Sequence, residues 1–156
     1  MRSASLTAIA LIVGVLLSTQ PHLNASTEAA TKFDGSWSAT AYFHEYKDPS
    51  GPIAKAVTMN FPVKIENGLL QGEWKSKKTS AWFKISGKLG ADGTGILNLH
   101  GITGPEEYNL KNNISEENHE RAGKPYGFEI KAQFDGRHGM GKRIGLRGTD
   151  FDFVKE

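Results

Sequence analysis

Histidines next to carboxylates are the residues of this chain whose types favour metal or acid–base chemistry. His44 precedes Glu45, and His119 lies between Glu117 and Glu120. A zinc ion needs its ligands within about 2.0–2.2 Å of one point, yet neither the His-x-His nor the His-Glu-x-x-His spacing occurs. Gly-x-Ser-x-Gly and cysteine are also absent. We therefore expect no metal and no cofactor. An enzyme would need two acids, or a histidine and an acid, converging in a pocket, and no motif selects such a pair, so we expect no catalytic site.

A second candidate is the glycine-rich, basic segment 134–143, Phe-Asp-Gly-Arg-His-Gly-Met-Gly-Lys-Arg. It lacks the Gly-Lys-Ser/Thr ending of a phosphate-binding loop, and no helical pattern follows it. The segment is interpreted as a flexible hairpin. Nucleic acid is not an expected partner, because the net charge of +2 offers no strong field for a polyanion.

Aromatic side chains, together with two arginines, are the better candidates for binding, since barrel mouths and carbohydrate platforms both use such rings. Trp74 and Trp82 flank a Lys-rich turn, and we expect them to stand close together across a hairpin, either as a platform or in ordinary cross-strand packing. The candidate ligand-binding residues are Trp37, Trp74, Trp82, Tyr42, Tyr126, Arg143 and Arg147.

The elements that position these residues follow a period of two, typical of strands with one buried face. In 56–65, for example, Val57, Met59 and Phe61 alternate with polar residues, and Pro62 on the outward set suggests an edge or a bulge. Asn67-Gly68 is a typical hairpin turn. The expected strands are 36–44, 56–65, 69–75, 81–89, 95–100, 126–134 and 144–154.

Short, glycine-containing links between these segments favour an all-β antiparallel meander of seven to eight strands. We expect a small closed β-barrel, which removes exposed edges, with a β-sandwich as the alternative that alternation does not distinguish. The one long interruption, 101–125, is polar and acidic. It is interpreted either as a recognition loop over the barrel mouth or as a solvated insertion.

Gly35-Ser36-Trp37 opens the first strand and resembles the Gly-x-Trp motif of lipocalin- and avidin-type barrels. In those families the indole closes the barrel base, often against an arginine from the last strand. The likeness implies that Arg143 or Arg147 packs against Trp37 through a cation–π contact. The alternative is that Trp37 is simply a core residue.

A wider resemblance covers Phe33 to Lys155 through short, glycine-based motifs. These are Phe33-Asp34-Gly35-Ser36-Trp37, 68–73, 85–89 with Asp92-Gly93, 102–104, 134–143 and 151–155. Together they resemble small exported β-rich proteins of rhizobial-type alphaproteobacteria, which implies compartment and fold more than activity. Members often carry cysteines where this chain has approximately Phe43 and Thr149. A bond between such cysteines would make the first and last strands neighbours, and here apolar packing would replace it.

The N-terminus predicts export. Arg2 precedes an apolar run from Ala8 to Leu17, which as a helix would rise only about 15 Å, half the hydrocarbon core of a bilayer. Residues 1–25 are interpreted as a signal peptide cleaved after Ala25, with a permanent anchor as the alternative. Cleavage would leave 131 residues with a net charge of +1. We expect a flexible segment, 26–32, followed by a single domain, 33–156.

The expected function is that of a monomeric bacterial binding protein, periplasmic or secreted, without a stable membrane span after cleavage. Its partner would be a small molecule, or a loop of an envelope protein, at one end of the barrel. The alternative is an exported inhibitor or envelope interaction protein that acts through the acidic 101–125 loop.

Overall fold

Strands make up nearly all of the described chain. The structure is a computed structural model, and it describes residues 31–48, 51–104 and 123–156. The predicted signal peptide and the central part of the 101–125 loop lie outside these residues. The elements are η1 (Thr31–Phe33), β1 (Gly35–Phe43), β2 (Tyr46–Asp48), β3 (Gly51–Ala54), β4 (Val57–Glu66), β5 (Leu69–Lys75), β6 (Trp82–Leu89), β7 (Thr94–Ile102), β8 (Pro125–Asp135), β9 (His138–Arg143) and β10 (Thr149–Lys155).

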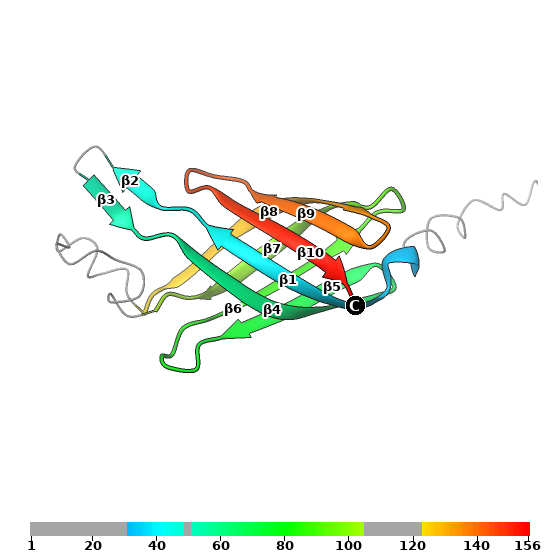
Figure 1. The fold of residues 1–156 in the computed structure, drawn as a ribbon, viewed down its shortest axis with the longest axis horizontal. Coiled ribbons are helices and arrows are strands. Elements are labelled where there is room, and N and C mark those ends of the chain that lie inside the picture. Colours follow the sequence, from blue (N-terminus) through cyan, green and yellow to red (C-terminus); the bar gives the residue numbers. More distant parts are fainter. Residues whose placement is uncertain (1–30, 49–50, 105–122) are drawn as a thin grey trace, which may run out of the picture.

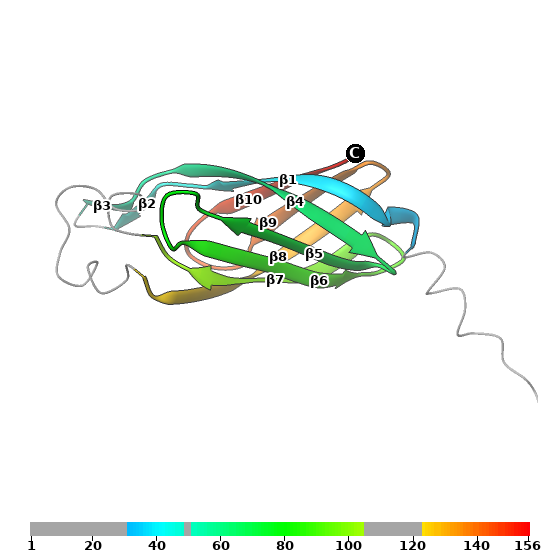
Figure 2. The ribbon, with the colours of Figure 1, turned by 90° about the horizontal axis from the view of Figure 1, so that it is seen from below.

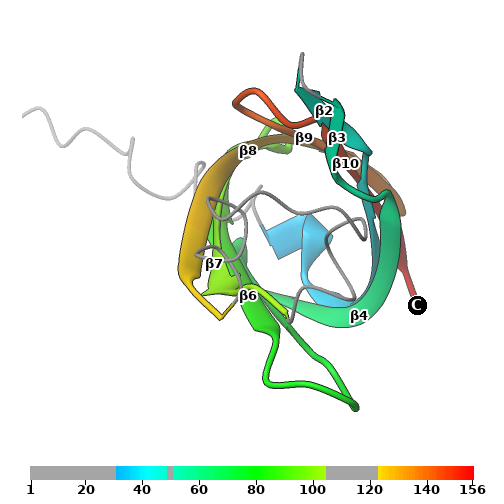
Figure 3. The same ribbon diagram turned by 90° about the vertical axis from the view of Figure 1, so that its left-hand side faces the viewer.

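Eight of the strands form a closed antiparallel barrel in the order β1-β10-β9-β8-β7-β6-β5-β4 (Figures 1 and 3). From β4 to β10, consecutive strands pair with each other, and β1 closes the ring by pairing with both β4 and β10. The β4–β5 turn uses the expected Asn67-Gly68 pair, with positive φ angles of 51° and 72°. The predicted all-β closed barrel is confirmed, and the sandwich alternative is wrong.

The seam between β1 and β10 joins the two ends of the described domain. Phe43 lies opposite Thr149 in this ladder, and Trp37 lies opposite Lys155. Phe43 is only 6% exposed, and its ring centroid lies 6.4 Å from that of Phe151. Apolar packing thus holds the first strand beside the last one without a disulfide bond.

Inward side chains fill the barrel with a continuous hydrophobic core. On β1 the inward residues are Trp37, Ala39, Ala41 and Phe43, so two large rings at the strand ends are separated by two small side chains. The alanines leave room for rings from other strands, because core side chains must fill the interior at nearly crystalline density. The core is therefore organised in layers along the barrel axis.

The segment 134–143 forms a hairpin, as predicted, with its turn at Gly136. Its second arm, 138–143, is strand β9, which was not among the expected strands and which pairs with both β8 and β10. Its inward positions include Gly139 and Gly141, and a Cβ on Gly139 would lie 2.6 Å from the Phe134 ring. The usual apolar alternation is missing because a neighbouring ring fills the space above the glycine. The last strand accordingly begins at Thr149 rather than at residue 144.

A small hairpin of β2 and β3 was not predicted from the sequence. It extends beyond the barrel from the ends of β1 and β4 (Figure 1). Its strands contain only three and four residues, which is too short for an alternating pattern to be recognised.

The wall between β4 and β5 is paired over only part of its length. Ladder pairs run from Val63–Gly72 to Glu66–Leu69, so β4 has no β5 partner from Pro62 back to Val57. Figure 2 shows the two strands diverging in this direction. Pro62, which has no backbone N–H, lies where this pairing ends, in agreement with the predicted edge position.

Candidate ligand-binding site

The two ends of the barrel differ in structure. We call the end with Phe33, Trp37 and the β4–β5, β6–β7 and β8–β9 turns the closed end. The opposite end, which we call the mouth, carries the β5–β6 and β9–β10 turns and the β2–β3 hairpin. In Figure 3, which looks along the barrel from the mouth, η1 lies across the far opening. η1 therefore covers the closed end.

Trp37 seals the closed end. Its side chain is fully buried, and its indole Nε1 donates to the carbonyl oxygen of Phe33 over 2.9 Å. Phe134 packs edge-on against the indole with a centroid distance of 5.2 Å. The predicted plug is thus present, but the cation is Lys155, with Nζ 5.8 Å from the indole centroid. The expectation that Arg143 or Arg147 contacts Trp37 is wrong, because both arginines lie at the mouth.

Partly exposed inward apolar side chains occur at the mouth on several strands. On β4, Val57 and Met59 are half-buried while the inward residues from Phe61 onward are buried. On β8, Tyr126 and Phe128 are half-buried while the inward residues from Ile130 onward are buried. On β5, Trp74 is half-buried while Leu70 is buried. These five residues pack against the core without being fully covered. We call them, together with Arg143, the mouth basin.

Aromatic rings form the floor of the mouth basin. Trp74 stacks on Phe83 with a centroid distance of 5.6 Å and an interplanar angle of 15°. The ring centroid of Phe43 lies 6.3 Å from that of Phe83 and 6.4 Å from that of Phe128. The ring centroids of Tyr126 and Phe128 lie 6.3 Å apart. The basin thus rests on a connected layer of aromatic rings.

Arg147 connects separate segments at the rim. Its Nε donates to the carbonyl oxygen of His44 and its Nη2 to that of Lys55, both over 3.0 Å. Its guanidinium carbon also lies 5.6 Å from the centre of the Phe43 ring. Because these bonds join the β9–β10 turn to the segments after β1 and before β4, the role of Arg147 is structural.

The contacts of Arg143 differ from those of Arg147. It ends β9, where it pairs with Ile130 of β8, and its guanidinium carbon lies 4.2 Å from the centre of the Phe128 ring. Its Nε is buried and has no hydrogen-bond partner. Thr149 is only 2% exposed, and its Oγ1 is likewise without a partner. The β9–β10 ladder ends at the pair Asp150–Lys142, and Thr149 and Arg143 are the residues that follow this pair on the two strands.

Burial governs the titration of the mouth groups. Burial raises the pKa of Tyr126 to about 12, although Arg147 and Arg143 pull it downward. Burial also lowers the pKa of Arg143, while Tyr126 acts in the opposite direction. The pKa of Arg147 is lowered by burial first and by Arg143 second. An arginine remains protonated in a protein, so the mouth carries two cations in a partly water-excluded environment.

Two of the predicted site residues face away from the interior. Trp74 pairs with Phe83, and Trp82 pairs with Lys75, so the two tryptophans lie on opposite faces of the hairpin. Trp82 contacts the His100 ring at 5.9 Å, outside the barrel. The expected Trp74–Trp82 pair is therefore wrong. Tyr42, which is 44% exposed, also lies on the outer face of its strand.

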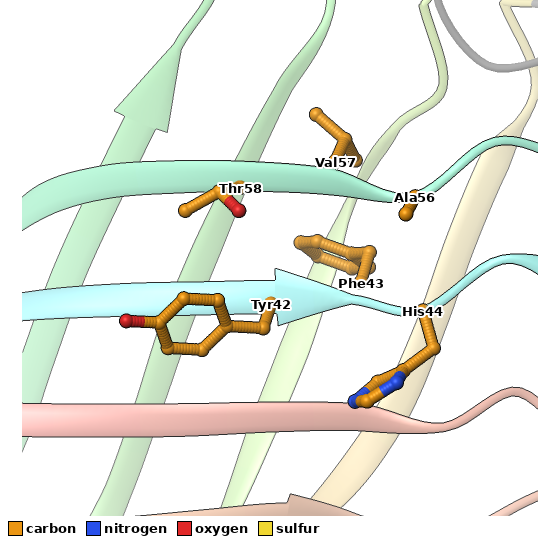
Figure 4. Close-up of a pocket in the computed structure, with 6 residues that line it drawn as sticks. All are labelled: Tyr42, Phe43, His44, Ala56, Val57 and Thr58. Atoms are coloured by element: carbon orange, nitrogen blue, oxygen red, sulfur yellow. The ribbon is translucent and has the colours of Figure 1, made fainter.

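A hollow of about 230 Å³ lies where β1 and β4 leave the barrel (Figure 4). Its volume is below the roughly 300–1,000 Å³ of typical small-molecule pockets. All its residues come from two neighbouring segments of the wall, so it is a feature of the rim. It is lined by Tyr42, Phe43, His44, Ala56, Val57 and Thr58.

One histidine–carboxylate pair does form, at the outer rim. His44 Nε2 lies 2.7 Å from Asp150 Oδ2, with both side chains about half exposed. Within residues 31–48, 51–104 and 123–156, no group of three histidine or acidic side chains is placed to hold a metal ion. The same residues contain no helix long and apolar enough to cross a membrane. The loop carboxylates Glu106 to Glu120 and His119 lie outside the described residues.

Four of the seven predicted binding residues meet at the mouth, namely Trp74, Tyr126, Arg143 and Arg147. The prediction missed Val57, Met59 and Phe128 as basin residues, although all three were in the inward alternating sets and this pattern was the available signal. It also missed the unpartnered hydroxyl of Thr149, for which the sequence carries no signal. The chain matches no protein-family model, no curated protein and no solved structure with which it was compared.

Proposed function

We propose that this protein is an exported, non-enzymatic binding protein that takes a small molecule in the mouth basin. The observation that carries this proposal is the burial gradient along the inward face. Fully covered side chains at the closed end give way to half-buried Met59, Trp74 and Phe128 at the mouth. Small-molecule sites are lined mainly by hydrophobic and aromatic side chains with a few polar groups, and this is the lining that the mouth offers.

The barrel wall also opens beside the basin. Between Val57 and Pro62, β4 lacks a β5 partner, and Met59 and Trp74 belong to the two strands that separate here. At the same rim, Arg147 joins the segments after β1 and before β4 to the β9–β10 turn through two carbonyl oxygens. In this stretch β4 keeps its pairing with β1 and lacks only its β5 partner, so a ligand could approach on the β5 side without unfolding the barrel. Export is proposed from the apolar segment within residues 1–25.

Tryptophan fluorescence tests the proposal, because the three tryptophans lie in different places. The protein would be titrated with pools of small organic molecules, and unfolding temperature would be followed in parallel. We expect at least one pool to shift or quench the emission and to raise the unfolding temperature, since ligand binding stabilises the native state.

Two conservative variants locate the response. Trp74→Phe should remove most of the emission change, whereas Trp82→Phe, on the outer face, should retain it. The proposal is contradicted if no pool changes emission or unfolding temperature. It is also contradicted if the response depends on Trp82 and not on Trp74.

A further inference from the structure

The two arginines at the mouth have different uses. Arg147 donates to two backbone carbonyl oxygens and holds the rim together. Arg143 makes no hydrogen bond through its buried Nε, and it rests on the face of Phe128 at 4.2 Å. Within the described part of the chain, no carboxylate forms an ion pair with Arg143. Its charge is therefore available to a group that is not part of the described chain.

A second buried polar group without a partner lies at the same end of the β9–β10 ladder. Thr149 is almost completely buried, and its hydroxyl makes no hydrogen bond. Thr149 and Arg143 are the residues that directly follow the last pair of the β9–β10 ladder, Asp150–Lys142, and both belong to inward-facing positions of their strands. Buried polar atoms in native proteins are nearly always paired, so two neighbouring exceptions require an explanation. A ligand that accepts hydrogen bonds from both would supply it.

From this arrangement we propose that the mouth basin binds a small organic carboxylate with an apolar tail. The carboxylate accepts hydrogen bonds from the Arg143 guanidinium and the Thr149 hydroxyl, and the tail covers Phe128, Trp74 and Met59. This inference rests on the proposed function and specifies its ligand class. A flat guanidinium fork fits the two oxygens of a carboxylate, and the half-buried aromatic surface fits an apolar group.

The alternatives fit these residues less well. A neutral apolar ligand would leave both polar groups unpaired and more deeply buried, which costs free energy. A phosphate ester usually engages several cations or backbone N–H groups, whereas Arg147 already donates to backbone carbonyls. A single available guanidinium with one hydroxyl therefore favours a single negative charge.

A matched pair of probes tests the inference directly. 4-Phenylbutyrate and its neutral amide, 4-phenylbutyramide, share the aromatic tail and differ in charge. Their binding to the full protein at neutral pH would be compared by isothermal titration calorimetry. We expect the carboxylate to bind at least about tenfold more tightly than the amide, with an affinity that falls as salt is added.

Substitutions at the two polar residues identify the contact. Arg143→Gln should abolish the preference for the carboxylate, while Arg143→Lys should retain part of it because the charge remains. Thr149→Val keeps the shape of the side chain and should weaken carboxylate binding several-fold without weakening amide binding. Arg137→Gln is the matched control, since Arg137 lies in the β8–β9 turn at the closed end and contacts the Lys155 carbonyl. It should leave both affinities unchanged.

The possible outcomes separate this inference from the proposed function. If both probes bind equally and Trp74→Phe weakens both, the basin binds ligands but the carboxylate inference is wrong. The inference is also overturned if neither probe binds, or if Arg143→Gln folds normally and keeps the preference. In those cases the fluorescence screen still decides the proposed function on its own. If Arg143→Gln does not fold, Arg143→Lys and Thr149→Val still decide the assignment.

Discussion

The closed end and the mouth are built from the same kinds of residues, yet they differ in how completely their polar groups are paired. At each end a cation lies over an aromatic ring, Lys155 over Trp37 and Arg143 over Phe128. At the closed end the indole N–H is bonded to Phe33, and both oxygens of Asp34 accept backbone N–H groups of the β4–β5 turn. At the mouth, two buried polar atoms have no partner.

This difference separates a well-packed base from an incompletely paired mouth. Fully covered rings with satisfied polar groups make the closed end a base for the barrel. Half-covered rings and unpaired donors at the mouth lower stability, and such local departures from good packing concentrate at functional sites. The following changes are designed to break or to sharpen this contrast.

The largest effect is expected from removing the plug at the closed end. Trp37→Ala should lower the free energy of unfolding by about 3–5 kcal/mol, because it creates a cavity and leaves the Phe33 carbonyl without its donor. Trp74→Ala should cost only about 1–2 kcal/mol, since that ring is already half exposed. Urea denaturation followed by circular dichroism measures both values. Equal losses at the two positions would remove the distinction between the ends.

A smaller contrast is expected between two glycine-to-alanine changes. A Cβ at Gly139 would lie 2.6 Å from the Phe134 ring, so Gly139→Ala should cost about 1–3 kcal/mol by overpacking. Gly148, at the mouth rim, is at ordinary contact distance from His44, 3.4 Å at the nearest, so Gly148→Ala should change stability by less than about 0.5 kcal/mol. The same denaturation experiment compares them. A tolerated alanine at position 139 would show that the closed end is packed less tightly than the structure indicates.

The barrel could be predicted from alternation because most strands carry large apolar residues on the inward face. Strand β9 was not predicted because its pattern hides the buried face. Glycine occupies inward positions, and Met140, which is 69% exposed, faces outward. Its pattern is the reverse of the usual one. Only the neighbouring Phe134 ring, which fills the space above Gly139, explains why this sequence is nevertheless a strand.

The site was predictable in composition but not in placement. Trp74 and Trp82 were both identified, yet the Lys75–Trp82 register puts them on opposite faces, and sequence alone does not fix that register. The cation over Trp37 is Lys155 because the β1–β10 ladder pairs these two residues directly. Such long-range pairing brings together residues more than a hundred positions apart, for which local patterns carry no information.

The smallest effect concerns the pH dependence at the mouth. Because burial raises the pKa of Tyr126 to about 12, above the ordinary value of 10.0, the folded state holds this proton more tightly than the unfolded state. Its contribution to stability is therefore complete below pH 10 and is lost as the pH rises toward about 12. The loss is measured as the fall in unfolding free energy of the native protein minus the fall in the Tyr126→Phe variant over the same pH range. We expect it to be at most about 1 kcal/mol because the ring is only partly covered. Tyrosinate absorbance should show an ionisation near pH 12 that the variant lacks. If the absorbance that the variant lacks lies near pH 10 instead, water reaches the Tyr126 hydroxyl freely, and the contrast between the two ends extends to solvent access as well as to packing.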